Sequence, residues 1–169
     1  MAWLPVFGRL RAAEPPGLAD AELAGSLAAE LDAAARARLG RSLGVFAVSA
    51  GGCGACALEL RALRGTVYDL ERLGLRFVGS PRQADVLLMT GPLTRVMAEP
   101  VAQAWAAMPG PKWAVALGAC AIDGGPFAGS YAVLGGVGGA VPVSMSILGC
   151  PPAPASILAG LRTLIEANA

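Results

Sequence analysis

The sequence predicts an α/β fold in which an open, mainly parallel sheet is covered by helices on both faces. Short apolar runs of strand length alternate with helix-like segments along the chain, an order typical of parallel sheets. The runs are apolar at nearly every position, as expected for strands buried on both faces. The 169 residues are enough for one domain with a sizeable core.

Helices are predicted where apolar side chains recur at helical spacing between stop signals. In residues 20–39, Leu23, Leu27 and Leu31 lie on one face, Asp20 is the expected cap and Gly40 ends the helix. The further helices are expected at residues 58–63, 67–73, 98–108 and 155–167. The segment before residue 18 is rich in proline and is expected to be an extended lead-in.

Strands are predicted at the short apolar runs, which cover residues 44–49, 75–78, 85–90 and 112–117. A fifth, short strand is expected at residues 141–143, where Pro142 is typical of a sheet edge or a strand terminus. The glycine-rich residues 121–140 show neither the helical nor the strand periodicity of apolar residues, so a long ordered loop is expected there.

Composition limits the kinds of function. Hydrophobic residues make up 55% of the chain and charged residues 15%, against about 25% charged in an average soluble domain. This low charge predicts a surface buried against partners, with a bias toward Ala and Gly as the alternative. A net charge of +1 without a basic stripe predicts no nucleic-acid partner. The sequence has no histidine, which excludes histidine bases and histidine metal ligands.

The start of the chain indicates the compartment. The segment 1–11 places its charges after a short apolar patch, whereas a secretory signal has them before it. No apolar run approaches the roughly 20 residues that span a bilayer. We therefore expect a cytoplasmic protein, in which thiols stay reduced and any membrane contact is made through a partner.

All four cysteines follow a predicted strand. Cys53 and Cys56 lie on a glycine-rich turn after the first strand, while Cys120 and Cys150 follow the fourth and fifth strands. In open α/β sheets ligands gather beyond the carboxyl ends of the strands. We therefore expect the four thiols to converge on one centre.

Four converging thiols suit an iron–sulfur cluster or zinc. Structural zinc sites usually draw on two Cys-x-x-Cys pairs, whereas one pair and two single cysteines occur here. A thioredoxin-like redox pair and four unrelated buried cysteines also remain open. Glycines near the cysteines favour the cluster, because the backbone must approach the sulfurs closely.

Several motifs in order resemble those of a known family. They are Cys53-x-x-Cys56-x-x-Glu59, Tyr68-Asp69-x-Glu71-Arg72-x-Gly74, Ser80-Pro81-Arg82-x-Ala84-Asp85, Thr90-Gly91-Pro92-Leu93-Thr94, Gly118-Ala119-Cys120, and Pro142-Val143 before Gly149-Cys150-Pro151-Pro152. From about residue 42 onward, the chain resembles the cluster-bearing small subunit shared by respiratory complex I and membrane-bound nickel–iron hydrogenases of the formate hydrogenlyase type.

The resemblance implies a flavodoxin-like domain over residues 42–169, preceded by an N-terminal extension, residues 1–41, with one helix. It implies one [4Fe-4S] cluster held by Cys53, Cys56, Cys120 and Cys150, next to the active site of a hydrogenase complex. The implied partners are a large catalytic subunit, a ferredoxin-like iron–sulfur subunit and membrane-embedded subunits. They would hold the chain peripherally at the cytoplasmic side of the inner membrane.

The cysteine spacing separates the branches of that family. Complex I subunits are expected to have adjacent cysteines at the first motif, whereas hydrogenase-type subunits have Cys-x-x-Cys. Cys53 and Cys56 therefore favour hydrogen over quinone as the terminal substrate. A complex I-like subunit that passes electrons to quinone is the second hypothesis, and a zinc-stabilised interaction module without redox activity is the third.

Two charged residues have two interpretations each. Glu59 is either a proton-relay group beside the cluster or a carboxylate favoured by the helix dipole in a first turn. Arg82 either lies near the cluster or the large subunit, or forms a loop salt bridge, for instance with Asp85. Ala57 and Ser144 stand where relatives often carry acids.

Overall fold

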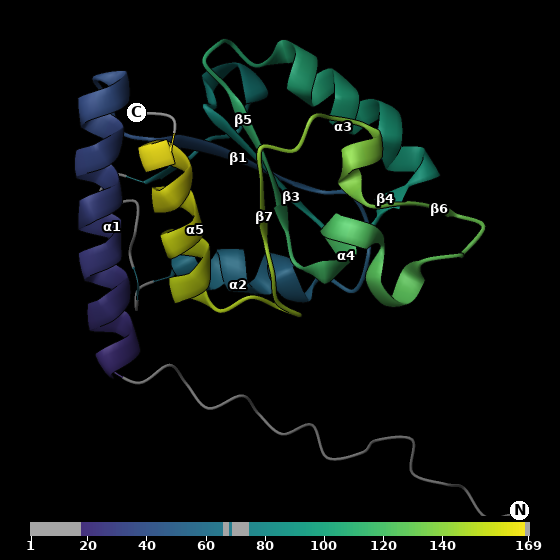
Figure 1. Ribbon diagram of the computed structural model, residues 1–169, viewed down its shortest axis with the longest axis horizontal. Coiled ribbons are helices and arrows are strands. Elements are labelled where there is room, and N and C mark those ends of the chain that lie inside the picture. The colour runs from purple at the N-terminus through teal and green to yellow at the C-terminus, as the bar shows by residue number, and fades with distance from the viewer. Residues whose placement is uncertain (1–17, 66–67, 69–74, 168–169) are drawn as a thin grey trace, which may run out of the picture.

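Five parallel strands form the main sheet of the computed structural model, which describes residues 18–65, 68 and 75–167 (Figure 1). Their order is β2-β1-β3-β5-β7, and every neighbouring pair is parallel. The strands are β1 (Gly44–Ser49), β2 (Arg76–Phe77), β3 (Val86–Thr90), β5 (Trp113–Leu117) and β7 (Met145–Ile147). Numbered along the chain, this is the order 2-1-3-4-5 of flavodoxin-like folds. The predicted fold class is confirmed.

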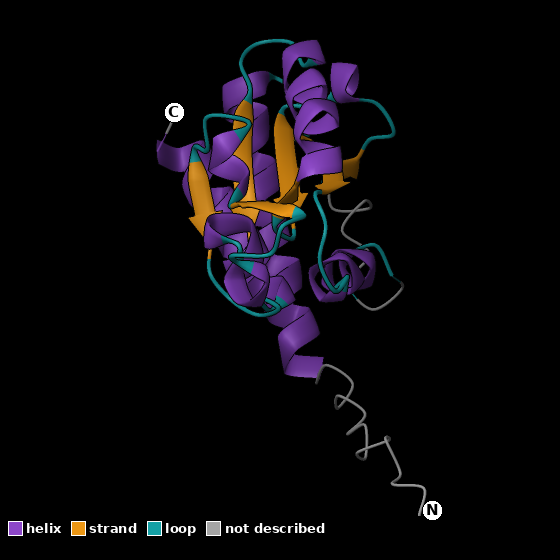
Figure 2. Cartoon of the chain, turned by 90° about the vertical axis from the view of Figure 1, so that its right-hand side faces the viewer, coloured by secondary structure: helices purple, strands orange, loops and turns teal. Residues whose placement is uncertain are grey.

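Helices cover both faces of the sheet (Figures 1 and 2). The helices are α1 (Leu18–Leu39), α2 (Ala55–Leu63) and α5 (Pro154–Ala167) on one face, and α3 (Arg95–Ala107) and α4 (Ala119–Asp123) on the other. Alternate side chains of β3 enter the two cores: Leu88 belongs to the α1–α5 cluster and Met89 to the α3 cluster. This explains why β3 is apolar at consecutive positions.

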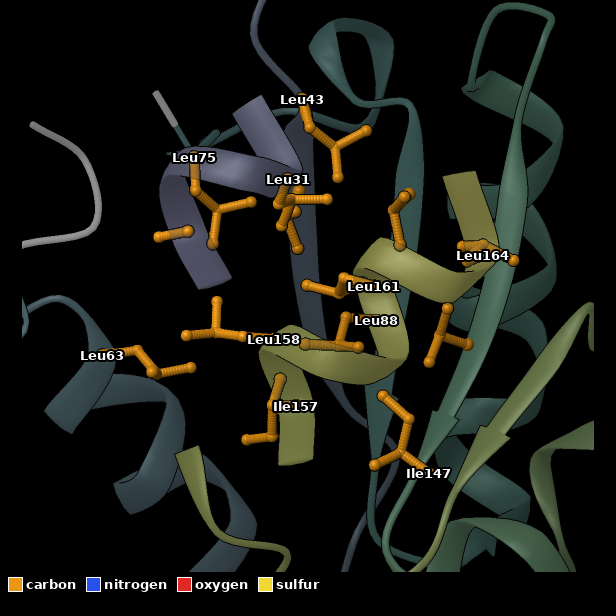
Figure 3. Packing of buried hydrophobic residues seen from close by; sticks show 14 of the residues in the cluster. Leu31, Leu43, Leu63, Leu75, Leu88, Ile147, Ile157, Leu158, Leu161 and Leu164 are labelled. Atoms are coloured by element: carbon orange, nitrogen blue, oxygen red, sulfur yellow. The ribbon is translucent and has the colours of Figure 1, made fainter. Parts of the chain in front are cut away.

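Helix α1 lies alongside α5 and shares its core (Figures 1 and 3). Ala24, Ala28, Leu31 and Ala35 are buried at helical spacing and belong to the cluster that contains Leu161. The small alanines allow the two helices to approach closely. The helix begins at Leu18, ahead of the predicted cap at Asp20. The division of the chain into residues 1–41 and 42–169 stays a prediction.

The predicted loop over residues 121–140 is wrong in detail. It contains the end of α4, two short 3-10 helices and the strand β6 (Val133–Gly135), which pairs antiparallel with β4 (Leu93–Thr94). These elements have three to five residues, too few for a period to emerge from the sequence. The predicted helical turn at residues 67–73 falls largely outside the described residues.

The fifth strand of the sheet lies later than predicted. It covers Met145–Ile147 rather than residues 141–143. Val141 instead packs in the α3 core, and pairing with β5 begins at Ser144, whose N–H donates to the Ala114 carbonyl at 2.8 Å. Ser144 thus lies at the amino end of β7, the end of the strand farther from Cys150.

The remaining predicted elements are confirmed with shifted ends. Helix α2 begins at Ala55, α3 at Arg95 and α5 at Pro154, each earlier than expected. Within the described parts of the chain, no helix combines the length and the apolar character needed to cross a bilayer.

A buried carboxylate ties together the amino ends of β1 and β3. Asp85 is 1% exposed and accepts hydrogen bonds from both terminal nitrogens of Arg41, at 2.5 and 3.1 Å. It also accepts the N–H of Gly44 at 2.8 Å. From the sequence, Arg82 was one possible partner of Asp85; in the structure the partner is Arg41.

Replacing Arg41 by alanine is expected to lower the free energy of unfolding by about 2 kcal/mol, because it leaves a buried carboxylate without its counter-charge. Chemical denaturation of the full chain measures this loss. Glu166→Gln, which removes the charge of an exposed carboxylate in an ion pair with Arg162, serves as the control and is expected to change little. Equal stability of both variants would contradict a role for the Arg41 pair.

Candidate metal centre

The four cysteines lie beyond the same edge of the main sheet. Cys53 is in the turn between β1 and α2, and Cys56 is in the first turn of α2. Cys120 lies at the start of α4, directly after β5, and Cys150 lies between β7 and α5. Because β1, β5 and β7 run parallel, their carboxyl ends bring these segments together.

Gly118 joins the two halves of the site. A Cβ built on Gly118 would lie 2.8 Å from the Cys56 sulfur and 3.3 Å from the carbonyl oxygen of Gly149. The thiol of Cys56 therefore packs on the backbone just before Cys120, next to the segment that carries Cys150. The φ of Gly118 is +87°, so glycine meets both the steric and the conformational need.

Backbone hydrogen bonds hold the segments of Cys120 and Cys150 together. The N–H of Gly118 donates to the Ile147 carbonyl at 2.8 Å, and the N–H of Ala119 donates to the Gly149 carbonyl at 3.0 Å. These bonds continue the β5–β7 pairing past the end of the sheet. The relative position of the two thiols is therefore set by the sheet itself.

The thiols also interact electrostatically. Burial raises the pKa of Cys56, and the neighbouring thiolates of Cys120, Cys53 and Cys150 raise it further. Burial likewise raises the pKa of Cys120, followed by the charges of Cys150 and Cys53. Each of these two cysteines therefore feels the charge of others in the set. Bound iron or zinc would reverse this preference, because a metal stabilises the thiolate.

Three of the four cysteines line one small pocket. A pocket of about 20 Å³ is lined by Cys53, Cys56 and Cys120 together with Thr90 and Gly91. Within the described residues, however, no three Cys, Asp or Glu side chains are placed to hold one metal ion. By its chemistry, a set of four thiolates suits either a structural zinc ion or a [4Fe-4S] cluster.

Exposure differs among the four thiols. Cys120 is buried and Cys56 is half-buried, while Cys53 and Cys150 are exposed. Two of the candidate ligands thus lie against the sheet and two lie at the surface. A group held by all four would sit at the boundary between this chain and whatever covers it.

The two charged residues singled out in the sequence lie in different places. Glu59 starts the second turn of α2, three positions after Cys56, and no acidic residue lies in the first turn of that helix. The helix-dipole explanation of Glu59 is therefore wrong, because that effect is confined to the first turn. Arg82 is exposed in the 3-10 helix Pro81–Gln83 that precedes β3. This is the edge of the sheet opposite the cysteines, so Arg82 is not carried into the proposed site.

One neighbour of the site was not predicted from the sequence, namely the segment 91–94, which follows β3. A Cβ on Gly91 would lie 1.7 Å from the Gly51 carbonyl oxygen, so this segment touches the turn that carries Cys53. Thr94 stands at the N-cap of α3, yet its side chain makes no capping bond to that helix. The sequence feature that could have identified this segment is its position directly after a central strand, because that places it at the same sheet edge as the cysteines.

In the cluster-free chain, an alkylating reagent is expected to modify Cys53 and Cys150 several-fold faster than Cys120. The thiolate is the reactive form, and Cys120 combines burial with a raised pKa. A time course of modification of the reduced protein, followed by peptide mass spectrometry, measures the four rates.

The control for this experiment is the same chain unfolded in urea, where all four thiols should react alike. The pH at which Cys56 reaches half of its full rate should be higher in the folded chain than in urea, because folding raises its pKa. If Cys120 reacts as fast as Cys53 in the folded chain, the described burial is wrong.

Comparison with known proteins places these features in context. The family model described as NADH ubiquinone oxidoreductase, 20 Kd subunit, matches residues 53–164. Formate hydrogenlyase subunit 7 of Escherichia coli (strain K12) is 43% identical over 132 residues, which are 78% of this chain and 52% of that protein. The chain thus spans about half the length of this curated relative.

A solved structure shares the fold. It comes from the membrane-bound sulfane sulfur reductase, an archaeal respiratory membrane complex. The match has a TM-score of 0.65 and 32% sequence identity, and it covers 78% of this chain and 71% of that chain.

Proposed function

Because this chain belongs to the family of the NADH ubiquinone oxidoreductase 20 kDa subunit, we propose that it is an electron-transfer subunit carrying one [4Fe-4S] cluster beside the active site of a membrane-bound hydrogenase. The observation that carries the proposal is the convergence of four thiols at one sheet edge, with the Cys56 sulfur packed on Gly118. The domain over residues 42–169 would then be the cluster-binding unit.

The proposed ligands are Cys53, Cys56, Cys120 and Cys150. When bound, the cluster would supply one-electron transfer. The chain's own residues hold and orient it: Cys56 and Cys120 anchor it against the sheet, and Cys53 and Cys150 close it at the surface. Glycine backbone near the sulfurs leaves N–H groups free to approach them, which is one way in which a protein tunes a cluster's potential.

The surface around the two exposed cysteines supports a catalytic partner. Leu58 is 64% exposed and Leu148 is 76% exposed; they lie close in sequence to Cys56 and Cys150, respectively. Exposed apolar side chains gathered beside a functional site are typical of an interface. We propose that a large catalytic subunit covers this face, and that a ferredoxin-like iron–sulfur subunit and membrane-embedded subunits complete a complex at the cytoplasmic side of the inner membrane.

Hydrogen is the favoured terminal substrate. The Cys-x-x-Cys spacing of Cys53 and Cys56 favours the hydrogenase branch, and the similarity to a formate hydrogenlyase subunit supports it. Electron transfer to quinone is the second candidate, supported by the description of the matching family model. In both cases the reaction chemistry belongs to the partner.

Anaerobic reconstitution of the full chain with iron and sulfide tests the proposal. The expected product is brown and binds about four irons per chain, one at each thiolate. It gives an electron paramagnetic resonance (EPR) signal after reduction. A colourless, EPR-silent chain that binds one zinc instead would support the zinc-stabilised module and refute the electron-transfer role.

Replacing Leu148 by lysine is expected to weaken association with the catalytic subunit at least tenfold, because a charge would be buried in an apolar interface. Co-purification of the complex from cells that express the variant measures this, and iron content should stay unchanged. Val96→Lys, at an 83% exposed position on α3, is the control. Normal association of the Leu148 variant would exclude this face as the interface.

A further inference from the structure

The segment that follows β3 braces the turn that carries Cys53. Both the hydroxyl and the N–H of Thr94 donate to the carbonyl oxygen of Ala50, at 2.9 and 3.1 Å. The N–H of Ala50 in turn donates to the Thr90 carbonyl at 2.8 Å. Ala50 is fully buried, and these bonds fix the backbone at which the turn begins.

Tight packing extends the brace toward the cysteine. A Cβ on Gly51 would lie 2.6 Å from the methyl carbon of Thr94, and a Cβ on Gly52 would lie 2.9 Å from the ring of Pro92. Gly51 and Gly52 both have positive φ, +145° and +92°. The path of the backbone from Ala50 to Cys53 is therefore shaped by contact with this segment.

Cys53 is held differently from the other candidate ligands. Cys56 and Cys120 lie within helices, and the segment of Cys150 is bonded to that of Cys120. Cys53 lies outside regular structure and is exposed. Thr94, although it stands at the N-cap of α3, makes no side-chain cap bond, so its hydroxyl serves the turn instead.

We propose that Thr94 is a positioning residue, whose hydroxyl seats the turn that places Cys53 for cluster binding. The inference rests on the proposed function for its cluster part only. The ordering of the turn is a property of the cluster-free chain and is measured without iron. Since the orientation of ligands and of the nearby N–H groups tunes a cluster, a misplaced Cys53 alters both retention and reduction potential.

The test compares Thr94→Val, which keeps the shape but loses the hydroxyl, with Thr94→Ser, which keeps the hydroxyl. Thr163→Val is the matched control, because the Thr163 hydroxyl also donates to a backbone carbonyl, that of Ala159, at 2.9 Å, but at an exposed position on α5. In the cluster-free full chain, amide hydrogen exchange of residues 50–54 is expected to be about fivefold faster in Thr94→Val, from the loss of one hydrogen bond. Thr94→Ser and Thr163→Val should match the natural chain there.

The second measurement uses the same variants after reconstitution with iron and sulfide. Thr94→Val is expected to lose iron several-fold faster to a chelator and to show a shifted reduction potential and EPR spectrum. Thr94→Ser should restore most of the retention. A general loss of stability would lower the melting temperature of Thr94→Val without changing the spectrum, and that result would overturn the positioning role.

The two proposals fail in different ways. If the natural chain takes up no cluster, the electron-transfer role falls while the exchange measurement still decides whether Thr94 orders the turn. If the natural chain holds a cluster and Thr94→Val matches it in exchange, iron loss and spectrum, the positioning role falls alone. Equal impairment of the valine and serine variants would also overturn it, because the hydroxyl would then be irrelevant.

Discussion

Replacing Cys120 by serine is expected to abolish cluster uptake, with an effect as severe as that of Cys53→Ser. Cys120 is buried at the start of α4, where no other thiol can take its place. A serine hydroxyl stays protonated at neutral pH and is a poor ligand for iron, which prefers thiolate. Iron content after anaerobic reconstitution is expected to fall at least about tenfold, since thiolate–metal bonds contribute many kcal/mol to such sites.

Comparing the two cysteine variants distinguishes an effect of ligation from an effect of burial. Burial alone would predict a large effect at Cys120 and almost none at the exposed Cys53, whereas shared ligation predicts equal losses. Far-ultraviolet circular dichroism checks that both variants fold, and Ser146→Ala, at an exposed position on β7, controls for the substitution of a nearby polar group. Full iron content in either cysteine variant would remove that residue from the ligand set.

Replacing Gly91 by alanine is expected to destabilise the chain more than any other single methyl group added near the site. The new Cβ would lie 1.7 Å from the Gly51 carbonyl oxygen and 2.5 Å from its carbon. Both atoms are backbone, so no side-chain rotation relieves the clash. The φ of +76° at Gly91 adds strain of its own. Together these effects cost about 3 kcal/mol or more, measured by chemical denaturation.

Gly129→Ala separates the effect of the steric clash on stability from the effect of the positive φ. Gly129 has a similar φ of +81°, but a Cβ there would meet no atom within 4 Å. Its replacement is therefore expected to cost only about 1 kcal/mol, the conformational part alone. Gly91→Ala should also reduce iron uptake, because relief of the clash moves the turn that carries Cys53. Equal stability of the two variants would mean that the backbones at Gly51 and Gly91 do not approach as described.

Patterns that depend on neighbours along the chain were predicted well. The strand at Gly44–Ser49 has the bounds that its apolar run indicated, and β3 and β5 agree to within one residue. These strands are buried, so hydrophobicity alone marks them. The last strand was misplaced because Val141 is apolar for another reason: it fills the core under α3. A short apolar run does not say whether it pairs with a strand or packs under a helix.

The charged residues illustrate a second limit. The motif of Arg82 left two interpretations open, a place near the cluster or the large subunit and a loop salt bridge. Arg82 precedes a strand and so belongs to the amino edge of a parallel sheet. The direction of β3 was already predictable, and with it the place of Arg82. By contrast, the bidentate pair of Arg41 with Asp85 joins residues far apart in sequence, and no local pattern marks such a pair.

The sequence by itself determined the fold class and the position of all four cysteines after strands. Buried strands and the turns that end them are recognised from residues that are neighbours along the chain. Only the tertiary structure decided which of those strand ends touch. It brought the Cys56 sulfur onto Gly118 and the Gly91 segment against Gly51, and it joined the Thr94 hydroxyl to the carbonyl oxygen of Ala50. These contacts follow from the strand order β2-β1-β3-β5-β7, which arises from packing of the whole chain and from no single segment.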